Sequence, residues 1–154
     1  MMMRLSFDVL KALAGKTLVT AESCTGGGIG AALTAIAGSS AVYKGGVISY
    51  TNEVKENLLK VDAQLLKIHG AVSLPVAKAM AEGARDILEA DIAVSVTGLA
   101  GPDGDDYGSP VGTVYIGYSD ITKTIAMEYH FCGSREEVRN QAIQAALELI
   151  LQES

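Results

Sequence analysis

Ser23 lies in a short turn whose residue types are suited to nucleophilic catalysis. The turn, residues 22–25 (ESCT), follows a short apolar segment and runs into Gly26 and Gly27. A turn between a strand and a helix exposes its side chains and aims backbone N–H groups and the helix dipole at a bound group. The segment is neither a Walker loop nor a GxSxG elbow. On pattern alone, a glycine-rich helix start whose Ser and Thr only cap the helix is an equally good interpretation.

A serine nucleophile needs a base, and Lys55 is the candidate. The two histidines are badly placed, because His69 lies at a predicted helix end and His130 inside a predicted strand. If Asn52 caps the next helix, Lys55 falls in the first turn, where a cation meets the unfavourable end of the helix dipole. Together with partial burial, this would lower its pKa from about 10.4 toward about 7–8, which suits a general base. The alternative is a solvated surface lysine, the commoner fate of a lysine on a short helix.

A tyrosine, a cysteine, an acidic loop and two arginines are further candidates. Tyr50 stands at the end of the strand before this helix, where its phenol could relay a proton or hold the amine. Cys24 has no histidine or CxxC partner, so we interpret it as a small buried side chain. The acidic loop at 103–106 lacks the EF-hand spacing, and we expect a solvated turn and no metal site there. Arg135 or Arg139 could clamp a phosphate, or could form surface pairs with acidic neighbours.

The elements that must hold these residues alternate between strand and helix along most of the chain. Apolar spacing and turn residues predict helices at 5–13, 26–38, 52–59, 62–68, 73–88 and 134–150, and strands at 17–20, 45–50, 91–97, 113–118 and 123–131. The last two strands form a hairpin, and Ser134 with Glu137 makes a capping box for the last helix. We therefore expect an α/β fold, a three-layer α/β/α sandwich with a mixed, mostly parallel sheet and a late antiparallel hairpin.

Polar loops follow the first three predicted strands. In open α/β sheets, ligands bind beyond the carboxyl ends of the strands. If these three strands are parallel neighbours, their loops converge on one cleft. Asn52, Thr97 and Gly98 occupy strand ends or the residues just after them, so we expect them to line this cleft.

Composition narrows the classes of function. The chain has 154 residues, 49% of them hydrophobic and 19% charged, so we expect one domain, residues 1–154, with a sizeable core. Its net charge of −6 and 5% aromatic content argue against nucleic-acid binding, which needs clustered Lys and Arg or stacking surfaces. We see no signal peptide and no apolar run of about 18 residues, so we expect no membrane partner. Two distant cysteines suit a cytoplasmic protein with reduced thiols.

Five sequence blocks resemble one known family. In chain order they are TAESCTGG at 20–27, GVISYTNEVK at 46–55, GAVS at 70–73, VTGLAGP at 96–102 and PVGTVYIG at 110–117. Together they resemble the C-terminal domain of the competence/damage-inducible CinA family, and the resemblance spans about residues 5–149. Five blocks in order and at matching intervals are specific, whereas any one of them is not. The loop at 103–109 (DGDDYGS) departs from the family pattern, so contacts from it are not carried over.

The resemblance implies an amidohydrolase. A free-standing domain of this kind is similar to the enzymes that hydrolyse the carboxamide of nicotinamide mononucleotide in pyridine-nucleotide salvage, giving nicotinic acid mononucleotide and ammonia. The catalytic serine of the family corresponds to Ser23, and its partners correspond to Tyr50 and Lys55. The resemblance further implies a small-molecule nucleotide substrate, no metal and no cofactor, and a homodimer or higher homo-oligomer.

The resulting hypothesis is acyl transfer. Neutral Lys55 takes the Ser23 proton, directly or through Tyr50, and the serine oxygen adds to the amide carbon. Backbone N–H groups from Thr25 to Gly27 would bind the oxyanion, and a helix N-terminus or Arg139 would meet the substrate phosphate. Two alternatives stay open. One is a non-catalytic nucleotide-binding or regulatory module, and the other is a metal-dependent phosphohydrolase that uses the acidic loop.

Overall fold

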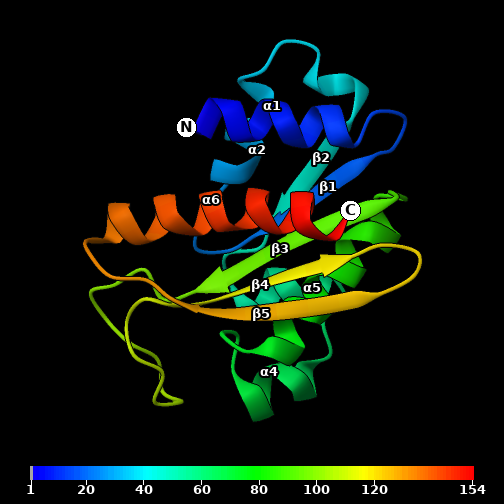
Figure 1. Cartoon of the computed structure of the whole chain (residues 1–154). Helices are drawn as coiled ribbons and strands as arrows, with labels where there is room; N and C mark the ends of the chain where they lie inside the picture. The colour runs from blue at the N-terminus through cyan, green and yellow to red at the C-terminus, as the bar shows by residue number, and fades with distance from the viewer. Residues whose placement is uncertain (1) are drawn as a thin grey trace.

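A central five-stranded sheet organises residues 2–154, which are the residues that the computed structural model describes (Figure 1). Its strands are β1 (Leu18–Glu22), β2 (Tyr43–Ile48), β3 (Ile92–Gly98), β4 (Thr113–Ser119) and β5 (Thr124–His130), in the spatial order β2-β1-β3-β4-β5. β1 pairs in parallel with β2 and β3, whereas β4 is antiparallel to β3 and β5. Three parallel strands beside an antiparallel hairpin make the sheet mixed, as predicted.

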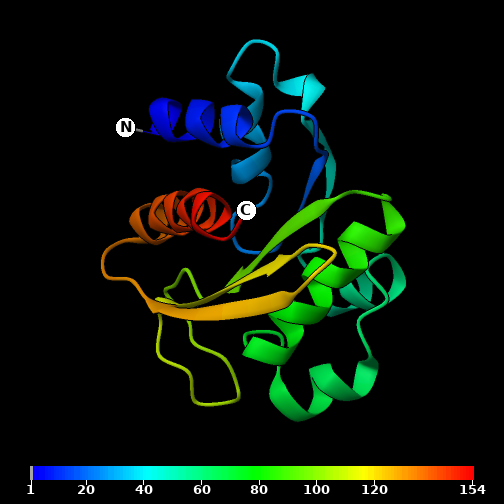
Figure 2. The same ribbon diagram turned by 45° about the vertical axis from the view of Figure 1, so that its right-hand side comes forward.

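Helices cover both faces of the sheet, which confirms the three-layer prediction (Figures 1 and 2). One layer holds α1 (Met2–Ala12), α2 (Gly28–Thr34) and α6 (Arg135–Glu153). The other holds α4 (Ala63–His69) and α5 (Leu74–Ile87). The short helix α3 (Asn52–Asn57) connects β2 to the second layer, and a turn of 3-10 helix, η1 (Ser39–Ala41), precedes β2.

Burial on both faces explains the apolar central strands. β1 is buried along its whole length and β3 along all but its last residue. Central parallel strands are nearly continuous apolar runs because helices cover both of their faces. Alternate residues of β3 enter different cores, with Val94 and Val96 packing in the α1–α2–α6 layer and Ala93 packing against the α5 layer. Edge strand β2 instead alternates between half-buried and exposed residues.

The glycine-rich turn after β1 is longer than predicted. α2 begins at Gly28 rather than at Gly26, and it ends at Thr34 rather than near Gly38. The φ angles of Gly26 (+58°) and Gly27 (+106°) lie in the left-handed region, which glycine adopts without steric cost. These two residues therefore belong to the turn, and they let the chain reverse tightly after Ser23.

Other boundaries lie close to the predicted ones, with two differences. β2 ends at Ile48, so Tyr50 lies beyond the strand rather than at its last residue. Ser73 holds the N-cap position of α5, but its hydroxyl donates to the Gly70 carbonyl instead of accepting from the helix. The capping box of Ser134 at the start of α6 is confirmed. Within residues 2–154, no helix is both long and apolar enough to cross a membrane.

Candidate active site

Ser23 lies at the centre of the sheet edge where the three parallel strands end. β1 runs between β2 and β3, and Ser23 is the first residue beyond it. Its N–H donates to the carbonyl of Val96 in β3 at 2.9 Å, and the N–H of Ser49, just past β2, donates to the carbonyl of Glu22 at 2.8 Å. Strand pairing thus continues one step past β1 on both sides. The predicted convergence of the three loops on one edge is confirmed.

The Glu22 carboxylate shapes the turn that presents Ser23. It is buried, and it accepts hydrogen bonds from Oγ1 of Thr25 at 2.6 Å and from the N–H groups of Ile29 at 2.8 Å and Gly30 at 3.0 Å. A carboxylate in this position satisfies free N–H groups in the first turn of α2 and complements the positive end of its dipole. Sequence reasoning missed this role, although an acidic residue before a predicted helix start is a recognisable signal. Because the Thr25 hydroxyl donates to Glu22, its role in the structure is to hold the turn.

Arg139 of α6 holds the same turn from its outer side. Its Nε donates to the Cys24 carbonyl at 3.0 Å, and its Nη2 donates to the Thr25 carbonyl at 3.1 Å. The Gly26 N–H is also engaged, since it donates to the Ser23 carbonyl at 3.1 Å. The prediction that Gly26 offers its N–H to the oxyanion is therefore wrong, because the turn closes on itself through that group. Phosphate binding by Arg139 stays a prediction, with Nε and Nη2 already bonded to backbone.

Lys55 reaches Ser23 from the short helix α3. Its side chain is only 1% exposed, and its Nζ lies 3.1 Å from Oγ of Ser23 and donates to the carbonyl of Ser49 at 2.7 Å. Burial lowers the pKa of Lys55 from 10.5 to about 8. The cause is desolvation rather than the start of the helix, because Thr51 and not Asn52 is the N-cap, which moves Lys55 further along the helix. The structure thus brings the predicted nucleophile and base into hydrogen-bond contact.

Tyr50 was predicted to hydrogen-bond to Lys55 or to relay its proton, but its hydroxyl bonds elsewhere. Its side chain is 59% exposed, and its hydroxyl accepts a hydrogen bond from Nη2 of Arg135 at 3.1 Å. Nη1 of Arg135 donates to the carbonyl of Gly101 at 2.6 Å, so this arginine ties the turn after β2 to the loop after β3. The phenol of Tyr50 lines the cleft beside the nucleophile turn and bonds to Arg135 rather than to Lys55. The relay of a proton through Tyr50 stays a prediction. The amine of Lys55 meets Ser23 directly.

A cleft of about 270 Å³ opens beside the nucleophile turn. Its walls come from the turn after β1, the turn after β2, the loop after β3 and the start of α6, and they comprise Cys24, Tyr50, Gly98, Leu99, Ala100, Gly101, Pro102, Asp103 and Arg135. Gly98 therefore lines the cleft as predicted. Asn52 lines a neighbouring hollow of about 310 Å³ that shares Leu99 with the first. Thr97 was wrongly predicted to line the cleft, because it is buried and its hydroxyl donates to the carbonyl of Ala71 at 2.8 Å.

The alternative chemistries find little support in the geometry. Cys24 is buried as predicted, and burial raises its thiol pKa to about 11, so the thiol stays protonated near neutral pH. In the acidic loop, Oδ1 of Asp105 accepts from the N–H groups of Tyr107 and Ser109, which makes it part of a turn. Among residues 2–154, no three His, Cys, Asp or Glu side chains gather as a metal site would require.

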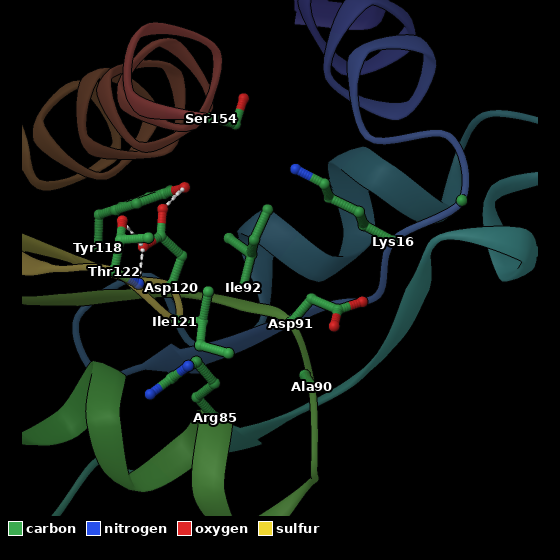
Figure 3. A pocket seen from close by; sticks show the side chains of 11 residues that line it. Lys16, Arg85, Ala90, Asp91, Ile92, Tyr118, Asp120, Ile121, Thr122 and Ser154 are labelled. Atoms are coloured by element: carbon green, nitrogen blue, oxygen red, sulfur yellow. Dashed lines mark hydrogen bonds between the residues drawn. The ribbon is translucent and has the colours of Figure 1, made fainter.

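A larger hollow of about 400 Å³ lies at the opposite edge of the sheet (Figure 3). It opens where β1 and β3 begin, between the end of α5 and the turn from β4 to β5. Charged side chains line it, among them Lys16, Arg85, Asp91 and Asp120. Asp91 accepts from the N–H and the hydroxyl of Thr17, so its carboxylate serves the fold. We therefore place the candidate active site at the Ser23 edge, where a hydroxyl and a buried amine meet.

Known proteins share both the sequence and the fold. A family model described as the CinA C-terminal domain matches residues 3–154. A "CinA-like protein" of Citrifermentans bemidjiense is 49% identical over 134 residues, which are 87% of this chain and 32% of that protein. Another, from Parasynechococcus marenigrum, is 60% identical over 105 residues, or 68% of this chain and 25% of that protein. The chain thus spans about a third or less of the curated relatives that it matches.

Solved structures match over nearly the whole chain. The crystal structure of the competence damage-inducible protein A from Klebsiella pneumoniae has a TM-score of 0.96 and 38% identity, covering 99% of this chain and 96% of that one. The competence/damage-inducible protein CihA from Agrobacterium tumefaciens gives a TM-score of 0.94 and 38% identity over 98% of this chain and 94% of that one. The arrangement of sheet and helices around Ser23 is therefore shared with these proteins.

Proposed function

The chain belongs to the CinA C-terminal domain family, and within that family we propose that it is an amidohydrolase that acts on nicotinamide mononucleotide. The products are nicotinic acid mononucleotide and ammonia. The observation that carries this proposal is the distance of 3.1 Å between Oγ of Ser23 and Nζ of Lys55, an amine that is buried and has a pKa of about 8. A nucleophile and a base within hydrogen-bond reach are the signature of covalent catalysis.

The reaction begins with proton transfer from Ser23 to Lys55. The Oγ–H bond breaks, an N–H bond forms on the neutral amine, and Oγ bonds to the carboxamide carbon. The Lys55 ammonium then returns a proton to the amide nitrogen, and the carbon–nitrogen bond breaks to release ammonia. Lys55 then takes a proton from water, the hydroxide oxygen bonds to the ester carbon, and the bond from that carbon to Oγ breaks as Lys55 returns the proton to Ser23. The acid formed loses its own proton to solvent and leaves as the carboxylate product. A pKa near 8 suits both steps, because the amine must gain and lose a proton within each cycle.

The oxyanion is assigned to backbone N–H groups of the nucleophile turn. Gly26 is excluded by its bond to the Ser23 carbonyl. The N–H groups of Thr25 and Gly27 have no backbone partner within residues 2–154, and both lie in the turn that Glu22 and Arg139 hold in place. One such donor contributes about 2.7–4 kcal/mol to the barrier reduction. The rigid turn therefore supplies the electrostatic part of catalysis.

We assign the substrate to the cleft beside Ser23, with its phosphate at Arg135. The cleft volume of about 270 Å³ accommodates the pyridine ring and part of the ribose. Arg135 lines this cleft, where it also donates to the Gly101 carbonyl and the Tyr50 hydroxyl, whereas Arg139 is not among the residues that line it. With a net charge of −6 on the chain, an anionic substrate needs local positive charge at the cleft. The Arg135 guanidinium supplies it.

Ammonia release tests the proposal. We expect turnover of nicotinamide mononucleotide by the wild type, and a loss of about 10⁴-fold or more in Ser23→Ala, because the nucleophile is gone. Cys24→Ala is the matched control, since the neighbouring buried thiol takes no part and activity should stay near that of the wild type. Parallel assays with free nicotinamide and with the dinucleotide define the substrate.

Three outcomes would contradict this function. Turnover by Ser23→Ala at the wild-type rate would exclude the serine mechanism. Nucleotide-dependent stabilisation against heat with no ammonia released by the wild type would instead identify a binding or regulatory module. Because no step uses a metal ion, activity that disappears on adding a chelator would favour a phosphohydrolase.

A further inference from the structure

Ser49 carries a buried hydroxyl with no hydrogen-bond partner among residues 2–154. The residue is fully buried and lies just past β2, where its carbonyl accepts from Nζ of Lys55 at 2.7 Å. Buried polar groups in folded proteins are nearly always paired, and leaving one unpaired costs about 1–3 kcal/mol. The same deficit occurs at Ser6 in α1 and at Nε of Arg85 near the opposite sheet edge. Only the Ser49 hydroxyl belongs to a residue that already bonds to the candidate base.

The protonated Lys55 side chain lacks a hydrogen-bond acceptor, and the hydroxyl of Ser49 could supply one. A lysine ammonium carries three N–H donors, and among residues 2–154 Nζ forms hydrogen bonds with Oγ of Ser23 and the carbonyl of Ser49. Acylation turns the Ser23 oxygen into an ester oxygen, which is a poorer acceptor than a hydroxyl. The ammonium formed in that step is therefore short of acceptors at the moment when its buried charge appears.

Within residues 2–154, no negatively charged side chain pairs with the Lys55 ammonium. Cys24, from the nucleophile turn, is the ionisable group that acts on the Lys55 amine, and its raised pKa keeps the thiol neutral. The Glu22 carboxylate is committed to the start of α2. On the helix of Lys55 itself, Glu53 is exposed and Glu56 half-buried, and neither forms a hydrogen bond with Nζ in the described chain.

The backbone directs the Ser49 side chain toward the layer that contains Lys55. Along β2 and its continuation, Ile48 and Tyr50 are exposed, whereas Val47 and Ser49 turn inward. Val47 packs against the core cluster that includes Leu59, two residues beyond the end of α3. The hydroxyl of Ser49 and the side chain of Lys55 therefore lie on the same face of the sheet.

We propose that Ser49 is a positioning residue, whose hydroxyl rotates about χ1 and accepts a hydrogen bond from Lys55 whenever that amine is protonated, both in the free enzyme and when Ser23 is acylated. This inference rests on the Ser23–Lys55 chemistry proposed above. No covalent bond to Ser49 forms or breaks, and the proton that leaves Ser23 stays on Lys55 until the leaving nitrogen takes it. The rotation converts an unpaired buried hydroxyl and an under-coordinated ammonium into one hydrogen bond.

The test is the pH dependence of Ser23 labelling by a fluorophosphonate probe, followed by intact mass spectrometry. Labelling needs neutral Lys55 and not the natural substrate, so it separates this inference from the identity of the substrate. Ser49→Ala removes an acceptor from the ammonium and so lowers its stability. We expect the midpoint of the labelling profile to fall by about 0.5–1 pH unit, and the plateau rate to fall by about 3–10-fold.

Three further variants control for a purely structural effect. Ser49→Thr keeps the hydroxyl and should restore the wild-type midpoint. Ser6→Ala removes the other unpaired buried hydroxyl, away from the site, and should leave the midpoint unchanged. If Ser49→Ala does not fold, Ser49→Cys replaces it, because a thiol is similar in size but a weaker acceptor, and its midpoint should also fall.

The outcomes are distinguishable. A midpoint in Ser49→Ala or Ser49→Cys equal to that of the wild type would overturn the role of Ser49 while leaving the Ser23–Lys55 pair intact. A failure of Ser49→Thr to restore the midpoint would do the same. Absence of labelling at Ser23 in the folded wild type would overturn the pair itself, and the Ser49 role with it.

Discussion

Ionisable side chains gather at both edges of the sheet, but only at the Ser23 edge does one of them lie beside a nucleophile. At the edge shown in Figure 3, Asp120 accepts from the hydroxyl of Tyr118 at 2.8 Å, from both the N–H and the hydroxyl of Thr122 at 2.8 Å, and from the N–H of Lys123 at 3.0 Å. Burial by itself raises the pKa of Asp120, but these donors together outweigh it and lower the pKa from 3.8 to about 2. At the other edge, burial lowers the pKa of Lys55 from 10.5 to about 8.

The difference lies in which protonation state the surroundings favour. Donors around Asp120 stabilise its charged form, so the carboxylate keeps its charge throughout the physiological range and only supports a turn. Desolvation of Lys55 disfavours its charged form, so the amine changes protonation state close to neutral pH. A carboxylate whose charge is stabilised by hydrogen bonds stays ionised and does not react, whereas an amine whose charged form is poorly solvated is readily neutral and can act as a base beside a hydroxyl. Predictions that compare the two edges follow from this contrast.

The largest effect is expected from Lys55→Met, which removes the base but fills the same buried space. Activity should fall by about 10²–10⁴-fold, the usual contribution of a general base. The free energy of unfolding of the wild type should instead increase as the pH rises. The folded pKa lies below the unfolded one, so between about pH 8 and 10.5 the unfolded chain binds the extra proton, and the free energy of unfolding rises with pH by an amount on the order of 3 kcal/mol.

Denaturant unfolding between pH 7.5 and 10 checks this. Wild type should gain stability over that range relative to Lys55→Met, in which the titrating group is absent. Lys16→Met at the opposite edge is the matched control, because Lys16 is exposed and its removal should leave the pH dependence of stability as in the wild type. Parallel curves for wild type and Lys55→Met would show that the amine is not poorly solvated, and the contrast between the edges would fail.

A middle-sized effect is expected from Arg139→Gln. Its bonds to the Cys24 and Thr25 carbonyls orient the nucleophile turn, and displacement of a catalytic group by about 1 Å costs up to about 100-fold. We expect kcat to fall by about 10–100-fold with a small change in KM. Arg135→Gln, four residues earlier on α6, should instead raise KM because we assign it to the phosphate. Steady-state kinetics of the two variants separate these roles, and the reverse pattern would exchange the assignments.

The smallest effect is expected at the inert edge, from Asp120→Asn. The carboxylate stabilises the fold at pH values above 3.8, and this contribution is lost as the pH falls from about 4 to 2. At neutral pH the variant should melt about 2–4 °C below the wild type, with ammonia release unchanged. Thermal unfolding at pH 7 and pH 2 measures both. A loss of turnover in this variant would mean that the two edges are coupled.

Local sequence patterns predicted most of the fold because they report local physics. The spacing of apolar residues, the capping box at Ser134 and the β-rich pair at 113–131 all predicted elements that the structure contains. The predicted boundaries were wrong at turns, where the backbone conformation of two or three residues decides where an element begins or ends. Gly26 and Gly27 extend the turn before α2, and β2 ends at Ile48, so that Tyr50 lies beyond the strand. In both places the boundary differs from the predicted one by two residues.

By itself, the sequence determined the layers and the edge at which the loops meet, because residue types and their order along alternating elements suffice for those conclusions. The choice of Ser23 and Lys55 needed the family resemblance as well, because each residue type alone fits a structural role equally well or better. Only the tertiary structure decided which groups touch. The bonds of Arg139 to the nucleophile turn, the bond of Arg135 to Tyr50, the committed hydroxyl of Thr97 and the unpaired hydroxyl of Ser49 depend on distances between segments that are remote in the chain. Contacts of this kind arise from packing, which no local pattern encodes.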